Sequence, residues 1–94
     1  MHTKLEDWKN GWFGLELGIL PEEIDSLIGQ LQMLKTDHDQ HFHISSDYKE
    51  LGGLGDIIVY VQSPEEKSNM ERVSSRALPP AEGLTPQRPN QTME

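Results

Sequence analysis

The chain has 94 residues, no cysteine and a formal net charge of −8 at pH 7. This length is enough for one domain, and the lack of cysteine excludes disulfides and thiolate–metal sites. An acidic chain repels phosphate backbones, so nucleic-acid binding is disfavoured, whereas a basic protein partner would be attracted. Acidity also serves solubility alone, and that simpler explanation stays open.

Apolar residues are concentrated in the first two thirds of the chain. The apolar runs end at Val61, and five of the six prolines follow it. Residues 1–63 also carry four lysines against eleven acidic residues, which leaves a net charge of −7. We therefore expect a polar lead-in over 1–10, a single α+β domain over 11–63, a weak helix or linker over 64–78, and a disordered tail over 79–94.

The first expected strand follows the lead-in. From Trp12 to Ile19 the residues alternate, which is typical of a half-buried strand. One face carries the large apolar residues Phe13, Leu15, Leu17 and Ile19, and the other carries Trp12, Gly14, Glu16 and Gly18.

A helix is expected to begin at Pro21 and to end near Thr36 or Asp37. Proline suits the first helical position, and carboxylates in the first turn favour the helix dipole. The apolar residues then recur with helical spacing, which predicts one buried stripe: Ile24, Leu27, Ile28, Leu31 and Leu34.

Two further strands are expected over 41–45 and 56–61, joined by a glycine-rich loop. The last is apolar at nearly every position, which is typical of a central strand. The chain order is therefore β-α-β-β, with a right-handed crossover from the first strand to the second and the third strand inserted between them. We predict a three-stranded mixed sheet of spatial order 1-3-2, with one helix on one face.

A single helix leaves the other face of such a sheet uncovered. The residues expected there are Trp12, His41, His43 and Tyr60. Exposed aromatic surface marks interfaces, so we expect a protein partner or self-association, including a homodimer, at this face. The alternative is that the chain after Val61 folds back over it.

Three of the four histidines lie within seven residues. His41 and His43 point the same way on a strand, and His38 or Asp39 could add a third ligand. Zinc or a similar divalent metal accepts such nitrogen and oxygen donors. A small histidine-based metal-binding protein is therefore the alternative function, although no cofactor is required by the pattern.

No catalytic constellation is recognisable. Ser45 and Ser46 follow His43 too closely to form a nucleophile–base relay. Asp47 and Asp56 are expected to face each other across the hairpin, without a cleft. The chain begins with no apolar signal segment and holds no run long enough to span a bilayer. We expect a cytoplasmic protein that is not an enzyme and does not bind membranes.

Four short motifs stand out along the chain: Gly11–Leu17, Pro21–Asp25, the His41–Ser45 segment and Gly55-Asp56-Ile57. Together they resemble a group of small uncharacterised bacterial proteins, some of which are similar to immunity-protein families of polymorphic toxin systems. The resemblance covers roughly residues 11–62. It implies an intracellular inhibitor that docks on a toxin domain, and it carries no catalytic residues. The favoured function is thus a non-catalytic protein-binding module, immunity-like, acting through the uncovered sheet face.

Overall fold

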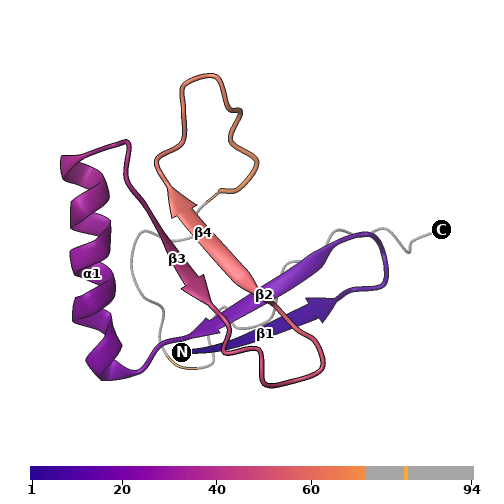
Figure 1. Cartoon of the computed structure of the whole chain (residues 1–94). Helices are drawn as coiled ribbons and strands as arrows, with labels where there is room; N and C mark the ends of the chain where they lie inside the picture. Colours follow the sequence, from indigo (N-terminus) through magenta and orange to yellow (C-terminus); the bar gives the residue numbers. More distant parts are fainter. Residues whose placement is uncertain (72–79, 81–94) are drawn as a thin grey trace.

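The computed structural model describes residues 1–71 and residue 80. The elements follow the order β-β-α-β-β (Figure 1). They are β1 (His2–Asp7), β2 (Phe13–Gly18), α1 (Pro21–Thr36), β3 (His41–Ser45) and β4 (Asp56–Tyr60).

Strands β1 and β2 form an antiparallel hairpin that projects from the rest of the molecule; we call it the arm (Figure 1). Its register pairs Leu5 with Leu15 and Asp7 with Phe13. The loop needs left-handed backbone at Lys9 (φ 62°) and Gly11 (φ 97°). Glycine adopts this conformation without a steric cost, so Gly11 lets the chain reverse.

The Trp8 side chain packs on the polar side of the arm. Its indole lies against Gly14, where an added Cβ would come within 2.9 Å of the ring. The indole Nε1–H donates to Glu6 Oε1 at 3.1 Å. Only a residue without a side chain leaves room for this packing.

Helix α1 begins at Pro21 although Leu20 offers no capping side chain. The Glu23 carboxylate compensates, since its Oε1 accepts the Leu20 N–H at 2.8 Å and its Oε2 accepts the amine of Met1 at 3.0 Å. The Leu20 N–H and then the amine hold the pKa of Glu23 below its usual value. The helix boundaries agree with the sequence prediction.

Strands β3 and β4 form the second antiparallel hairpin, beside α1 (Figure 1). Exposure alternates along both strands, because one face lies towards the helix. The half-buried residues of that inner face are Phe42, Ile44, Ile57 and Val59. Leu34 on α1 is the one buried hydrophobic side chain in the described part of the chain, at 7% exposure.

The predicted three-stranded sheet of order 1-3-2 is wrong. The described residues form two separate two-stranded sheets, β1-β2 and β3-β4. Residues 1–10, expected to be a polar lead-in, contain β1. Strand β2 pairs with β1 and not with β3 or β4. The antiparallel pairing of the last two strands agrees with the prediction, but β4 is not central, because β3 is its one partner among the described strands.

The segment over 64–78 is expected to be a weak helix or a linker. Residues 61–71 contain turns and bends but no helix, and residues 72–79 and the tail over 81–94 lie outside the described residues. Among the residues that the structure describes, no helix has the length and apolar character needed to cross a membrane.

Candidate protein interface

The side of β3–β4 turned away from α1 carries a set of exposed residues that we call the outer face. The strand register places His41 opposite Tyr60, His43 opposite Ile58, and Ser45 opposite Asp56. All six are exposed, with Ile58 at 54% and Tyr60 at 53%. The hairpin thus brings together three of the four residues predicted from sequence.

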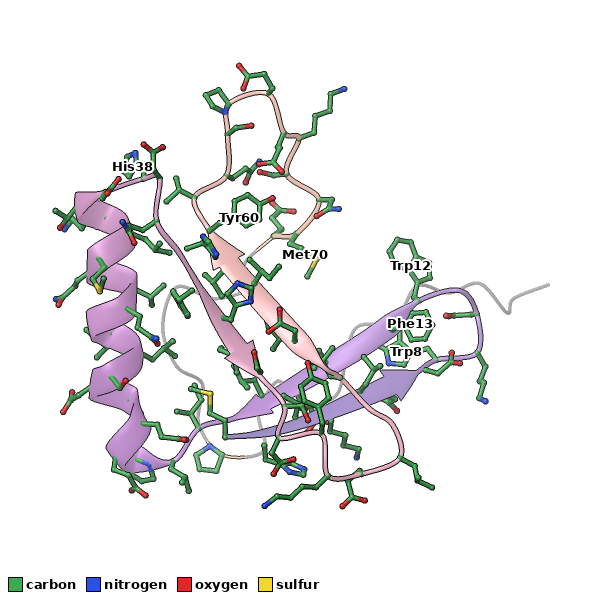
Figure 2. The ribbon with its side chains drawn as sticks, viewed as in Figure 1. Trp8, Trp12, Phe13, His38, Tyr60 and Met70 are labelled. Carbon is green, nitrogen blue, oxygen red and sulfur yellow. The ribbon has the colours of Figure 1, made fainter. Side chains whose placement is uncertain are left out.

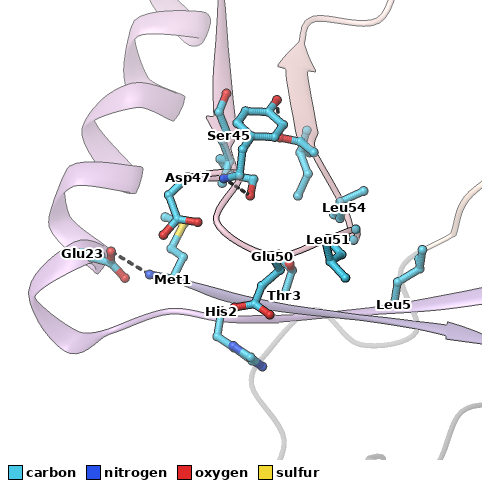
Figure 3. A pocket seen from close by; sticks show the side chains of 17 residues that line it. Met1, His2, Thr3, Leu5, Glu23, Ser45, Asp47, Glu50, Leu51 and Leu54 are labelled. Atoms are coloured by element: carbon cyan, nitrogen blue, oxygen red, sulfur yellow. Dashed lines mark hydrogen bonds and ion pairs between the residues drawn. The ribbon is translucent and has the colours of Figure 1, made fainter.

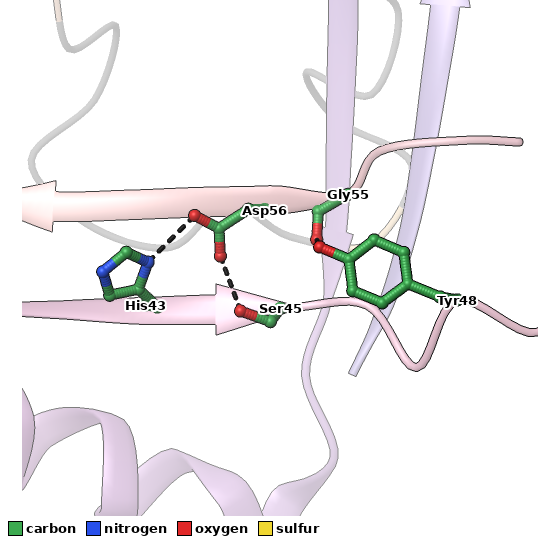
Figure 4. A network of polar contacts seen from close by, with 5 residues as sticks. All are labelled: His43, Ser45, Tyr48, Gly55 and Asp56. Carbon is green, nitrogen blue, oxygen red and sulfur yellow. Dashed lines mark hydrogen bonds and ion pairs between the residues drawn. The ribbon is translucent and has the colours of Figure 1, made fainter.

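The two imidazoles of the outer face touch. The ring centroids of His41 and His43 are 5.0 Å apart, in an edge arrangement with an interplanar angle of 70°. His43 Nδ1 lies 2.9 Å from Asp56 Oδ2 across the strand pair (Figure 4). That contact fixes the orientation of the His43 ring.

Asp56 joins the two strands through both of its carboxylate oxygens. Besides the contact with His43, its Oδ1 accepts the Ser45 hydroxyl at 2.6 Å (Figure 4). The Ser45 hydrogen bond and then the His43 contact hold the pKa of Asp56 below its usual value. Serine bonds the carboxylate rather than the imidazole, so the three groups do not form the serine–histidine relay that nucleophilic catalysis uses. Together His43, Ser45 and Asp56 link β3 to β4, and we call these contacts the Asp56 pin.

The β3–β4 loop is held at its base by Tyr48. The Tyr48 hydroxyl donates to the Gly55 carbonyl at 3.0 Å (Figure 4). The Ser46 N–H donates to the same carbonyl at 2.9 Å. Tyr48 takes a left-handed backbone (φ 57°) to reach it. Asp56 faces Ser45 in this register, so the expected Asp47–Asp56 pair is wrong.

Tyr60 is tied to the segment that follows β4. Its hydroxyl donates to Glu66 Oε2 at 2.5 Å, while Glu66 Oε1 accepts the Ser63 N–H at 2.9 Å. The hydrogen bond to tyrosine lowers the pKa of Glu66, and the neighbouring carboxylate raises the pKa of Tyr60. The tyrosine ring is therefore held in place while half of its surface remains exposed.

Trp12 is the predicted interface residue that does not join the outer face. It lies on the arm loop, away from Tyr60 at the end of β4 (Figure 2). Its backbone N–H donates to Asn10 Oδ1 at 3.1 Å. The alternating pattern predicts that Trp12 is the first residue of a strand. In the structure β2 begins one residue later, at Phe13, so Trp12 belongs to the loop.

His38 and Asp39 lie in the turn between α1 and β3 (Figure 2). Asp37 organises this turn, because its Oδ1 accepts the Asp39 N–H at 3.0 Å and its Oδ2 accepts the Gln40 side chain at 3.2 Å. Within residues 1–71 and 80, no group of three or more His, Cys, Asp or Glu side chains is placed to hold a metal. The zinc site of His38, Asp39, His41 and His43 stays a prediction.

A cleft of about 780 Å³ lies between the start of the arm and the β3–β4 loop (Figure 3). Thr3 and Leu5 from β1 line one side, and Ile44 and Ile57 from the inner face of β3–β4 line the other. The cleft therefore joins the apolar side of the arm to the inner face.

Sequence reasoning missed Ser45, Asp56 and Glu66 as supports of the outer face. The pairing of Ser45 with Asp56 depends on the strand register, which the glycine-rich loop alone does not determine. Glu66 gave no signal, because its contact with Tyr60 depends on how the chain turns after Ser63.

A comparison of the chain with known protein families, with curated proteins and with solved structures finds no match.

Proposed function

We propose that this chain is a non-catalytic protein-binding module and that its partner docks on the outer face of β3–β4. The observation that carries the proposal is the composition of that face. Ile58 and Tyr60 are each about half exposed, and they lie opposite the two touching imidazoles of His43 and His41. Apolar and aromatic side chains on a flat face, with a polar border, suit the centre of a protein interface.

The polar contacts around this face support the proposal because they hold it rigid. The Asp56 pin fixes His43, and Glu66 fixes the Tyr60 hydroxyl. A face that is already ordered loses less side-chain entropy when a partner binds.

The charge of the chain favours a basic partner. The net charge is −8, and Asp56 and Glu66 are carboxylates on or beside the outer face. Complementary charge speeds encounter and selects among partners. The partner that fits both this charge and the resemblance of the sequence is a basic toxin domain, which the module would bind and inhibit.

The test compares two alanine variants of equally exposed side chains. Tyr60→Ala removes the ring from the outer face, and Met33→Ala removes a 58%-exposed side chain from α1. Each tagged chain is used to capture proteins from a lysate of the source cell, with quantitative mass spectrometry. We expect a basic protein whose recovery falls at least about tenfold with Tyr60→Ala, as for an interface hot spot, but is unchanged with Met33→Ala.

Co-expression with that protein then tests inhibition. Wild-type chain should restore growth of cells that make the captured toxin domain, and Tyr60→Ala should not. Equal capture by both variants would show that the outer face does not bind, and capture without rescue would remove the inhibitory role.

A further inference from the structure

The apolar side of the arm is open to solvent. Leu5, Phe13, Leu15 and Leu17 share this side, because the register pairs Leu5 with Leu15 and alternate residues of a strand point the same way. Their exposed fractions run from 37% to 59%. The opposite side of the arm carries charged residues and the Trp8 indole over Gly14.

Helix α1 carries a second exposed apolar patch. Ile24, Ile28 and Leu31 lie along one stripe of the helix and are each 46–47% exposed. The cleft between Thr3 and Leu5 on one side and Ile44 and Ile57 on the other connects the arm with the inner face of β3–β4. These seven side chains of the arm and the helix form what we call the open apolar surface.

The size of this surface approaches that of a stable interface. A large aromatic side chain presents on the order of 200 Å² in full, which is an upper value for the leucines and isoleucines. Seven side chains at roughly half exposure therefore present at most about 700 Å² over the two patches. A standard interface removes about 800 Å² from each partner.

We propose that the open apolar surface is the contact between two copies of this chain. One buried hydrophobic side chain, Leu34, is too small a core for the described residues. Whatever covers the open apolar surface must therefore be bound whenever the chain is folded. A second copy is always available in equal amount, whereas a regulatory partner is not, and many homodimers have no stable folded monomer.

The shape of the chain fits a symmetric pair. The arm projects from the body and the cleft lies at its base (Figures 1 and 3). In a two-fold dimer the same patch serves both partners, so each arm lies on the other copy's α1 stripe. The outer face of β3–β4 stays free, and the dimer does not depend on the function proposed for it.

The first experiment measures the mass of the full-length chain by analytical ultracentrifugation at micromolar concentrations. We expect twice the chain mass of 10.7 kDa. Since both copies are acidic, raising the salt concentration should strengthen association. A monomer at every concentration and salt would overturn the proposal.

Two glutamate variants locate the contact. Leu15→Glu places a charge on the open apolar surface, and we expect the dimer dissociation constant to rise at least about a hundredfold, because an unpaired charge would be buried. Met33→Glu makes a similar change at an exposed site on the opposite side of α1 and should leave dissociation unchanged. Equal effects of the two variants would contradict the proposal.

Leu15→Glu could also prevent folding, so a second measurement uses the wild-type chain. A mixture of isotope-labelled and unlabelled copies gives NMR contacts that occur only between chains. We expect them at the methyl groups of the arm and the α1 stripe. Contacts between chains only at Ile58 and the rest of the outer face would overturn the inference. So would contacts from residues 72–94 to the arm of the same chain, recorded in a separate spectrum that also detects contacts within one chain.

Discussion

The molecule contains two antiparallel hairpins that use alternation in the same way and differ in what covers them. In β3–β4 the inner residues are half-buried beside α1, and the outer face is pinned by Asp56. In the arm the apolar side chains remain 37–59% exposed, and the packed side is the one where Trp8 lies on Gly14. Alternation therefore defines which side chains share a face, but it does not say whether the same chain supplies the cover.

The difference also separates two kinds of exposed apolar surface. The outer face of β3–β4 mixes two large apolar residues with imidazoles and a carboxylate, and polar contacts hold it. The open apolar surface consists of aliphatic residues and one phenylalanine. The first composition suits a partner that comes and goes, and the second suits permanent burial.

The largest expected effect tests whether α1 and the β3–β4 hairpin share a hydrophobic core. Leu34→Ala should lower the free energy of unfolding by about 2–4 kcal/mol, because it removes a buried side chain and leaves a cavity. Met33→Ala, one residue away and 58% exposed, should cost less than about 0.5 kcal/mol. Urea unfolding followed by circular dichroism measures both. Similar losses would mean that α1 is not packed through Leu34.

An intermediate effect compares glycines in the arm and the body. Gly14→Ala should destabilise by about 1–2 kcal/mol, since its methyl group would meet the Trp8 indole at 2.9 Å. Gly29→Ala in α1 meets nothing within 4 Å and should stabilise by about 1 kcal/mol, because alanine is the better helix former. The same unfolding assay applies. A neutral Gly14→Ala would show that Trp8 does not pack on the arm.

The smallest effect concerns the pin of the outer face. The pKa of Asp56 is lowered in the folded chain, so its stabilisation is present above the ordinary aspartate pKa and is lost as the pH falls through the folded value. Asp56→Asn should therefore lower the melting temperature at neutral pH, and the difference from wild type should shrink as the pH falls through the lowered pKa of Asp56, where wild type loses the same charge. Asp47→Asn on the same hairpin is the control. A melting difference that persists unchanged in acid would rule out the carboxylate as the cause.

Sequence patterns located the helix and three of the strands well, because these segments contain strong local signals. Pro21 with its acidic neighbours set the start of α1, and the alternation around Phe42 and Ile44 set β3 within one residue. Strand β1 was missed, since Leu5 is its one large apolar residue and the strand depends on pairing with β2. Asn10-Gly11, a turn dipeptide just before an alternating run, was the signal that could have found it.

The sheet order could not be deduced once β1 was missing. A three-strand scheme has to place β2 next to another strand, and the crossover rule then favours a mixed sheet. In the structure β2 pairs with β1, so it needs no place beside β3 or β4. At the candidate interface, the alternating pattern correctly placed His41, His43 and Tyr60 on one face. The position of Trp12 could not be predicted in the same way, because it depends on where β2 begins. The contacts that hold the face, from Asp56 and Glu66, depend on register and on loop geometry.

The positions of the aromatic residues make the two halves separately observable. Both tryptophans of the chain, Trp8 and Trp12, lie in the arm loop, whereas both tyrosines, Tyr48 and Tyr60, lie in or beside the β3–β4 hairpin. Fluorescence excited at wavelengths that only indole absorbs therefore comes from the arm alone. The NMR signals of the tyrosine rings report the other hairpin. One unmodified sample can show whether the two halves lose their structure together or in sequence.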